Sequence, residues 1–142
     1  MNMSDGLIAG KVGIVTGSSR GIGFAIAKLF LSQGARVYAV SRTAGDLGTK
    51  LTELNETYKT GEIIPVYMDL RDQDAVKQLI LKIRKEEKSL DFLINNAGLV
   101  SYELLAFTDY DKMREMFEVN VVCAVRLIQA VSRIMAKQNS GA

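Results

Sequence analysis

Four apolar, β-branched runs alternate with four segments of helical spacing, and this alternation constrains the fold more than any other feature. Short runs of this kind are typical of buried strands, whereas apolar residues three and four positions apart are typical of helices. The predicted strands are 11–16, 36–41, 63–70 and 90–95, and the predicted helices are 22–32, 47–58, 72–88 and 109–137. Because such alternation favours right-handed βαβ crossovers, we predict a doubly wound α/β fold with a parallel sheet.

The composition is that of an ordinary globular domain. Its 142 residues are 48% hydrophobic and 24% charged, which is enough for one core, and no repeat or linker divides residues 1–142. The net charge of +2 is too small and too dispersed to predict nucleic acid or a membrane as a partner. No basic leader and no continuous run of about 18 apolar residues is seen, so a cytoplasmic protein is expected.

The cysteine and histidine content limits the kinds of acid–base and metal site that the chain can form. The single cysteine, Cys123, lies in an apolar run and is expected to be a small buried hydrophobe. The chain contains no histidine, the commonest acid–base group and metal ligand, so we predict no metal site.

The stretch TGSSRGIG, residues 16–23, joins the first predicted strand to the first predicted helix. A turn at this place directs backbone N–H groups and the positive end of the helix dipole at one point, which suits a pyrophosphate. Gly17, Gly21 and Gly23 are expected to allow the turn and the close approach of the ligand. Glycines alone are a weak signal, but their position within a βαβ unit favours dinucleotide binding.

The end of the second predicted strand bears on the choice of coenzyme. NAD-binding domains usually place an acidic residue here to hold the ribose 2′-hydroxyl, whereas this chain has Ser41 and Arg42. The planar guanidinium of Arg42 suits a 2′-phosphate, and Arg20 in the turn could reach the same group. We therefore predict NADP(H), with the alternative that both arginines are solvated surface residues.

Together with NNAG at residues 95–98, the glycine turn resembles the short-chain dehydrogenase/reductase family, and most closely its NADP-preferring members. The resemblance implies a Rossmann-type fold, with Asp69 and Leu70 at the adenine ring and Asn95 as a strand-stabilising neighbour. The coenzyme-binding residues that it implies, with the turn glycines, are Gly17, Ser18, Ser19, Arg20, Gly21, Ile22, Gly23, Arg42, Asp69, Leu70, Asn96, Ala97 and Gly98.

The resemblance implies a catalytic tetrad that consists of an asparagine, a serine, a tyrosine and a lysine four residues after the tyrosine. Asn120 matches the asparagine, whose main chain helps to hold a water; alternatively, Asn120 bends the helix or bonds a neighbouring loop. No tyrosine here is followed by lysine at that spacing. An arginine stands four residues after each of Tyr38, Tyr67 and Tyr110. Of these pairs, only Tyr110 with Arg114 is a conceivable substitute for the catalytic tyrosine and lysine.

The last residues, QNSGA, look like a turn into another strand, so we expect the chain to be cut after the fourth βα unit, with the catalytic tyrosine and lysine beyond Ala142. The chain alone would then be an inactive NADP(H)-binding module. The complete protein would be an NADPH-dependent carbonyl reductase.

The substrate implied by the resemblance is a 3-oxoacyl thioester of fatty acid biosynthesis, carried by an acidic acyl-carrier protein that Arg133 would meet. Other ketones, sugars and steroid-like alcohols remain open, and Arg133 could simply compensate the helix dipole. The family also forms homo-oligomers, often tetramers, through the long helix. Its apolar residues Met113, Phe117, Val121, Val125 and Ile128 allow such an interface, or packing on the sheet.

Overall fold

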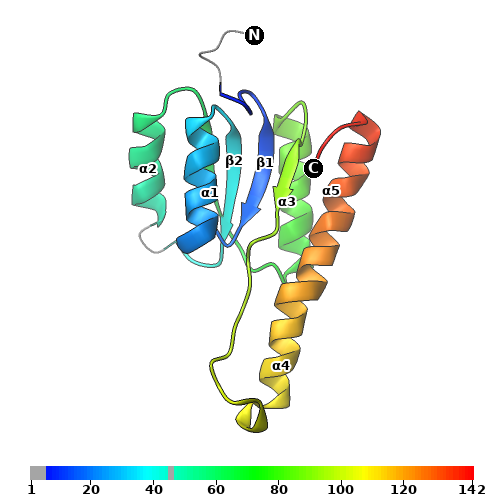
Figure 1. Ribbon diagram of the computed structural model, residues 1–142. Coiled ribbons are helices and arrows are strands. Elements are labelled where there is room, and N and C mark those ends of the chain that lie inside the picture. Colours follow the sequence, from blue (N-terminus) through cyan, green and yellow to red (C-terminus); the bar gives the residue numbers. More distant parts are fainter. Residues whose placement is uncertain (1–5, 45–46) are drawn as a thin grey trace.

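A computed structural model describes residues 6–44 and 47–142 (Figure 1). Residues 1–5, on which part of the expectation of no leader rests, lie outside the described residues. The strands are β1 (Val12–Thr16), β2 (Arg36–Ser41), β3 (Glu62–Tyr67) and β4 (Phe92–Ile94). They form one parallel sheet in the order β3-β2-β1-β4, in which Ile14 pairs with both Tyr38 and Leu93. The predicted parallel α/β architecture is confirmed.

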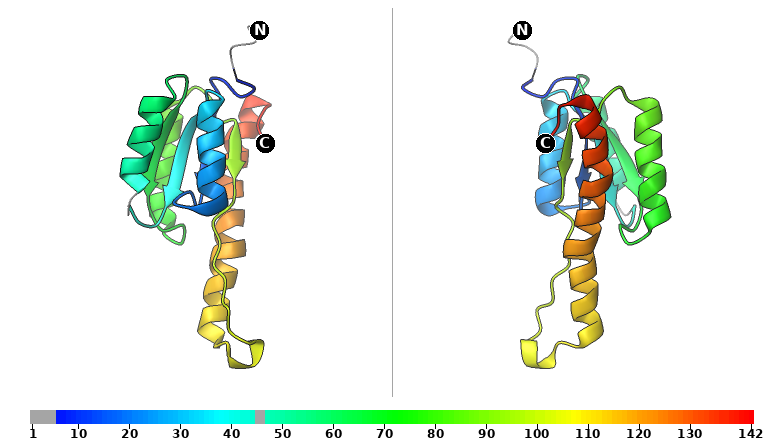
Figure 2. Two further views of the ribbon diagram at one scale, coloured as in Figure 1. Left: turned by 60° about the vertical axis from the view of Figure 1, so that its left-hand side comes forward. Right: turned by 90° about the vertical axis from the view of Figure 1, so that its right-hand side faces the viewer.

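The helices cover both faces of this sheet. They are α1 (Gly21–Ser32), α2 (Leu47–Thr57), α3 (Gln73–Glu86), the short 3₁₀ helix η1 (Leu105–Phe107), α4 (Tyr110–Phe117), the π-helical segment η2 (Glu118–Cys123) and α5 (Ala124–Gln138). Buried residues of α1 and α2 form one core cluster with the sheet, and those of α3 and α5 form a second. The sandwich is therefore doubly wound (Figures 1 and 2).

Two strands are shorter at their carboxyl ends than the sequence predicts. β3 ends at Tyr67, and the next residues turn toward α3, whose N-terminus is capped by Asp72. Pro65 is the fourth residue of β3, opposite Ala39. Its missing N–H is tolerated there because β3 is an edge strand.

Tyr38 links the sheet to the end of α3. Its ring is fully buried in β2, and its hydroxyl donates to Glu87 Oε1 at 2.6 Å. Arg36 Nε donates to the same carboxylate oxygen at 2.6 Å. Burial, followed by the contact with Glu87, raises the pKa of Tyr38 far above its usual value. Tyr38 is therefore a protonated core residue and does not serve as an acid–base group.

An arm extends beyond the carboxyl edge of the sheet, where the glycine turn also lies (Figures 1 and 2). It consists of the elements η1, α4 and η2. The apolar stripe on the long helix, formed by Phe117, Val121, Val125 and Ile128, is exposed. The helix packs on the sheet through Leu127 and Val131 instead. Packing on the sheet therefore does not account for this stripe.

The continuous helix Tyr110–Gln138 has 29 residues and an 18-residue window of mean hydropathy 1.5, of which 17% is buried. By length and composition alone it is long and apolar enough to cross a membrane. Arg126 and Arg133 interrupt the apolar residues of this helix, so the sequence contains no continuous apolar run of that length there. The core helix of a soluble protein passes the same test, and one such helix is weak evidence for a membrane span.

The chain turns back onto the sheet after α5. Asn139 adopts the left-handed conformation with φ 54°, and Gly141 has φ 131°. The Ala142 N–H then donates to Asp91 O at 3.0 Å, and the Leu93 N–H donates to Ala142 O at 2.9 Å. These two bonds place Ala142 along the outer edge of β4, as the turn-like QNSGA segment predicts.

Asp91 fastens the start of β4 to the start of β1. Its carboxylate accepts from the Val12 N–H at 2.9 Å, from Ser89 Oγ at 2.8 Å and from Lys11 Nζ at 3.0 Å. Burial alone would raise the Asp91 pKa, but these hydrogen bonds hold it below the usual aspartate value. Because the folded-state pKa is depressed, the carboxylate stabilises the fold above the unfolded-state pKa, and this contribution is lost as pH falls through the folded-state pKa.

Asp91→Asn is expected to lower the free energy of unfolding by about 1–2 kcal/mol at pH 7, because the half-buried cluster loses its negative charge and one of its two acceptor oxygens. The difference from the wild type should shrink as the pH falls below about 4. Urea unfolding between pH 7 and pH 3 measures it. Glu56→Gln, at an exposed position of α2, should change stability by less than about 0.5 kcal/mol. A pH-independent effect of Asp91→Asn would contradict the ionic explanation.

Candidate functional site

The glycine turn joins β1 to α1 in the backbone conformation that the sequence predicts. Gly17 and Gly21 have φ values of 65° and 59°, in the left-handed region that favours glycine. A Cβ atom on Gly17 would lie 2.8 Å from Ala97 Cα and 2.9 Å from Asn96 Nδ2. Gly23 is needed for space, because a Cβ there would overlap both Gly17 O and Asn96 Nδ2. The turn is therefore packed directly against the segment that follows β4.

Thr16 and Asn96 clamp the turn in place. Thr16 Oγ1 accepts from the backbone N–H groups of Asn96 and Ala97, both at 3.0 Å. Asn96 Nδ2 donates to the carbonyls of Thr16 and Gly17, both at 3.1 Å. The predicted residues of the turn and of NNAG thus come together. Thr16 was missed by the sequence analysis, although a hydroxyl at the end of a buried strand, directly before a glycine turn, was a usable signal.

The N-terminus of α1 has no side-chain cap. Arg20 occupies the cap position without a side-chain hydrogen bond, and the first turn contains no acidic residue. In contrast, Asp72 caps α3 and Asp109 caps α4, each accepting two backbone N–H bonds. The first N–H groups of α1 and the positive end of its dipole are therefore free of a protein anion, which suits a phosphate ligand.

The hydroxyl residues of the turn have different environments. Ser18 is fully buried, and both its N–H and its Oγ donate to Val40 O, at 3.1 and 3.0 Å. It therefore anchors the turn to β2 and is not on the open side. Ser19, Arg20 and Ile22 are exposed. Of the predicted coenzyme contacts in the turn, these three residues and Gly21 are exposed, whereas Gly17 is half-buried and Gly23 is buried.

Arg42 and Asp69 follow the adjacent strands β2 and β3 at the same edge of the sheet. Both carboxylate oxygens of Asp69 accept from Arg71, whose Nη2 lies 2.6 Å from Oδ2. Side-chain hydrogen bonds from Arg71 hold the pKa of Asp69 below its usual range, and the charge of Arg42 adds to this effect. Arg42 itself is exposed at this edge.

The predicted adenine contacts of Asp69 and Leu70 are less accessible than expected. Arg71 Nη1 also donates to Glu115 Oε1 at 2.7 Å, so Arg71 ties Asp69 to α4. Leu70 is half-buried and packs against the core cluster under α3 and α5. The bridging role of Arg71 is not predictable from the sequence, because it depends on α4, more than forty residues away.

Asn120 lies in the π-helical segment η2 and bonds the loop that follows NNAG. Its Oδ1 accepts from the Leu99 N–H at 2.7 Å, and its Nδ2 donates to Leu99 O at 2.9 Å. These contacts agree with the alternative prediction, in which Asn120 bends the helix or bonds a neighbouring loop. π-helical segments of this kind are frequent at functional sites. A role of its main chain in catalysis stays a prediction.

Asn120→Ala is expected to speed hydrogen exchange of the Leu99 amide, because its acceptor is lost. Asn120→Asp is the matched control, since it retains an acceptor for the Leu99 N–H while losing the donor to Leu99 O. The free energy of unfolding should fall by about 1 kcal/mol in the alanine variant. Equal exchange rates at Leu99 in the wild type and the alanine variant would contradict this assignment.

Comparison with known proteins places this geometry in a family. The family model described as short chain dehydrogenase matches residues 11–142. The chain belongs to the short-chain dehydrogenase family. The match includes the glycine turn, the NNAG segment and Asn120.

Individual members of the family are similar over nearly the whole chain. A 3α-hydroxysteroid dehydrogenase of Mediterraneibacter gnavus is 32% identical over 137 residues, covering 95% of this chain and 54% of that protein. A 3-oxoacyl-(acyl-carrier-protein) reductase of Chlamydia trachomatis is 34% identical over 140 residues, covering 96% and 55%. The chain thus spans about half the length of these curated relatives.

Solved structures of the family have the same fold. An L-sorbose reductase from Gluconobacter frateurii, crystallised with NADPH and L-sorbose, superposes with a TM-score of 0.86 at 32% identity. The match covers 98% of this chain and 52% of that reductase.

Among the described residues, Arg114 bonds an acidic neighbour and not Tyr110. Arg114 Nη1 donates to Asp111 at 3.0 Å, and both are highly exposed, so the conceivable pair of Tyr110 and Arg114 has no support among the described contacts. Cys123 is buried as expected, and burial raises the pKa of its thiol. Within residues 6–44 and 47–142, no cluster of three or more potential ligands could hold a metal ion.

Proposed function

We propose that this chain is the NADP(H)-binding part of an NADPH-dependent carbonyl reductase. The observation that carries the proposal is Arg42, an exposed cation at the end of β2, at the sheet edge where the uncapped glycine turn opens. A 2′-phosphate satisfies this arginine, whereas a 2′-hydroxyl leaves it without a charge partner. The L-sorbose reductase with 32% identity was crystallised with NADPH, which supports the same choice.

Gly17 and Gly23 let the turn pack closely on itself and on Asn96, and the start of α1, which carries no side-chain cap and no acidic residue in its first turn, suits a pyrophosphate. The free N–H groups at the start of α1 would hold the pyrophosphate, and Arg42 with Arg20 would hold the 2′-phosphate. Ala97 and Gly98, fixed by the clamp of Thr16 and Asn96, would line the coenzyme beyond the turn. Bound NADPH supplies a hydride for carbonyl reduction. The residues of this chain bind and orient the coenzyme.

For the substrate we propose a 3-oxoacyl thioester, supported by the 34% identity to the chlamydial 3-oxoacyl reductase. A steroid ketone is the second candidate, because the identity to the 3α-hydroxysteroid dehydrogenase is nearly the same. The exposed stripe of Phe117, Val121, Val125 and Ile128 supports a homo-oligomer formed through the long helix. Arg133 is exposed, as contact with an acidic carrier would require.

A second function, coenzyme binding without turnover, is favoured by one specific observation. The 142 residues contain no tyrosine followed four residues later by lysine. Such a chain would hold NADP(H) as a fragment, a nucleotide sensor or half of a split enzyme.

Titration of the 142-residue chain with NADPH, followed by coenzyme fluorescence, tests the proposed function. We expect saturable binding that is tighter for NADPH than for NADH. Acetoacetyl thioester is then added, and absorbance at the nicotinamide band reports consumption. Binding without consumption supports the module reading for this chain, whereas consumption supports the reductase reading. Absence of NADPH binding would overturn both.

A further inference from the structure

Two opposite charges, Arg42 and Asp69, lie side by side at the carboxyl edge of the sheet. The Met68 N–H donates to Ser41 O at 2.9 Å, so the pairing of the two chains continues one residue past the end of β3. Arg42 and Asp69 are the next residues on the two chains. Because neighbouring strands lie about 4.8 Å apart, the side chain of Arg42 is long enough to reach the carboxylate of Asp69.

In the structure, however, Asp69 pairs with Arg71 and not with Arg42. Arg71 Nε donates to both carboxylate oxygens at 3.0 Å, and Nη2 donates to Oδ2 at 2.6 Å. The backbone N–H of Arg71 donates to Oδ1 at 2.9 Å. Three N–H groups thus occupy most of the roughly four acceptor positions of one carboxylate. Within residues 6–44 and 47–142, Arg42 forms no salt bridge.

Glu115 on α4 fixes the direction of the Arg71 guanidinium. Its Oε1 accepts from Nη1 at 2.7 Å, and Nη1 is the one guanidinium nitrogen that does not bond Asp69. The side chains of Asp69, Arg71 and Glu115 remain 36%, 41% and 43% exposed. Ion pairs this exposed stabilise a fold by less than about 1 kcal/mol. Stability is therefore a weak reason for this arrangement, and a chain that lacks Arg71 should still fold.

An unpaired Asp69 would oppose a 2′-phosphate at Arg42 in two ways. Its carboxylate would compete for the guanidinium that the phosphate needs. Its charge would also repel the phosphate, which carries nearly two negative charges at neutral pH. The pKa of Asp69 is lowered first by the side-chain hydrogen bonds from Arg71 and further by the charge of Arg42, so Asp69 and Arg42 are close enough to interact.

We propose that Arg71 is a positioning residue that determines coenzyme choice, because it holds Asp69 away from Arg42 and keeps Arg42 available for the 2′-phosphate of NADP(H). Arg71 itself does not need to touch the coenzyme. This role rests on the proposed function, in which Arg42 binds the 2′-phosphate. It adds that the choice between NADPH and NADH depends on a residue outside that contact.

The ratio of NADPH affinity to NADH affinity tests this role, because the two coenzymes differ only in the 2′-phosphate. Arg71→Ala should lower the ratio about tenfold, since the released Asp69 pairs with Arg42. Adding Asp69→Asn to this variant should restore the ratio to within about threefold of the wild type, because the competing charge is gone. Any effect of Asp69 on the adenine ring cancels from the ratio, since both coenzymes carry that ring.

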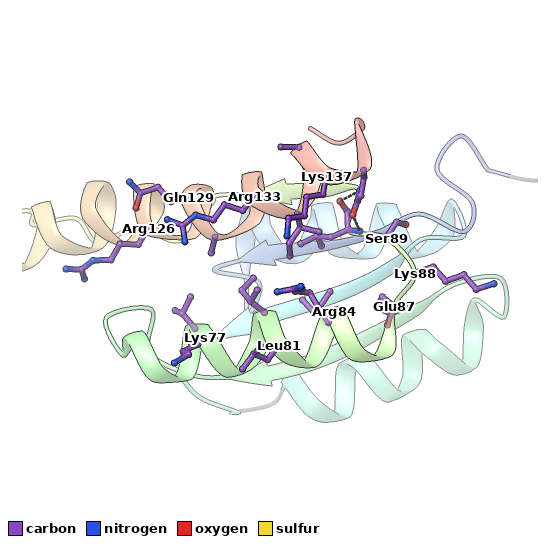
Figure 3. A pocket seen from close by; sticks show the side chains of 18 of the residues that line it. Lys77, Leu81, Arg84, Glu87, Lys88, Ser89, Arg126, Gln129, Arg133 and Lys137 are labelled. Carbon is purple, nitrogen blue, oxygen red and sulfur yellow. Dashed lines mark hydrogen bonds between the residues drawn. The ribbon is translucent and has the colours of Figure 1, made fainter.

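Two further variants control for charge and for shape. Arg84 lies on α3, where it lines the open groove between α3 and α5 (Figure 3), and it forms no salt bridge within the described part of the chain. Arg84→Ala removes one positive charge there and should leave the ratio within about twofold of the wild type. Arg71→Lys keeps the charge but loses the planar fork, so its ratio should lie between those of the wild type and Arg71→Ala.

A measurement without coenzyme reports the pairing of Arg42 directly. The NMR signal of the Arg42 Hε proton is assigned by its loss in Arg42→Lys, and its exchange with water is then measured. Exchange should be fast in the wild type and slower in Arg71→Ala, where Asp69 bonds the guanidinium. Adding Asp69→Asn should make it fast again. A loss of structure alone would not slow this exchange.

The outcomes separate this role from the proposed function. Unchanged Hε exchange or an unchanged ratio in Arg71→Ala would overturn the role of Arg71 while leaving the 2′-phosphate site intact. The same conclusion would follow if Asp69→Asn failed to restore the ratio. Equal affinity of the wild type for NADPH and NADH would instead overturn the 2′-phosphate site, and the role of Arg71 with it, even if the exchange slowed as expected.

Discussion

Gly23→Ala is expected to reduce NADPH affinity by at least about 100-fold, equivalent to about 2.7 kcal/mol. The new Cβ would overlap Gly17 O and Asn96 Nδ2, and would lie 2.9 Å from Gly17 C. Since two of these atoms are backbone of the turn itself, the overlap cannot be relieved by rotating a side chain. The turn must shift away from α1, and the N–H groups that would meet the pyrophosphate move with it. Fluorescence titration with NADPH measures the loss.

Stability measurements separate a displaced turn from an unfolded chain. Overpacking in Gly23→Ala should lower the free energy of unfolding by about 1–3 kcal/mol, measured by urea unfolding. The matched control is Gly48→Ala in α2, where the nearest atom to the new Cβ is the terminal hydroxyl of Tyr67, at 3.2 Å. This variant should be no less stable than the wild type, because alanine has the higher helix propensity. Unchanged NADPH affinity in a folded Gly23→Ala variant would remove the turn from the binding site.

Arg42→Asp is expected to reverse the coenzyme preference. The substitution replaces a bidentate donor by a carboxylate that repels the 2′-phosphate, which carries nearly two negative charges at neutral pH. NADPH affinity should fall about 100-fold, while NADH affinity should stay the same or rise, because an aspartate can accept from the ribose 2′-hydroxyl. Parallel titrations with the two coenzymes give the ratio directly.

Two further variants refine the role of Arg42. Arg42→Lys keeps the charge but loses the planar fork, so it should retain a weaker preference for NADPH. Lys59→Asp makes the same change of charge at an exposed residue beyond the end of α2, and should leave the ratio unchanged. An unchanged ratio in Arg42→Asp would overturn the 2′-phosphate assignment while leaving the pyrophosphate turn intact.

Much of the candidate site was predictable because its signals are local. The left-handed conformations of Gly17 and Gly21 follow from a turn that must join a strand to a helix within five residues. The exposure of Ser19 and Arg20 is likewise a property of that short turn. The inward orientation of Ser18 was not predictable, because its acceptor is Val40 O on the neighbouring strand.

The alternation of strands and helices and the position of the glycine turn were determined by the sequence alone, since both depend on periodicity and on backbone conformations within a few residues. The tertiary structure decided which distant groups meet. Thr16 meets Asn96 only because β1 and β4 are adjacent in the sheet, and Arg71 joins Asp69 to Glu115 only because α4 extends past the end of β3. Contacts between residues tens of positions apart depend on strand order and helix placement, which no local pattern encodes.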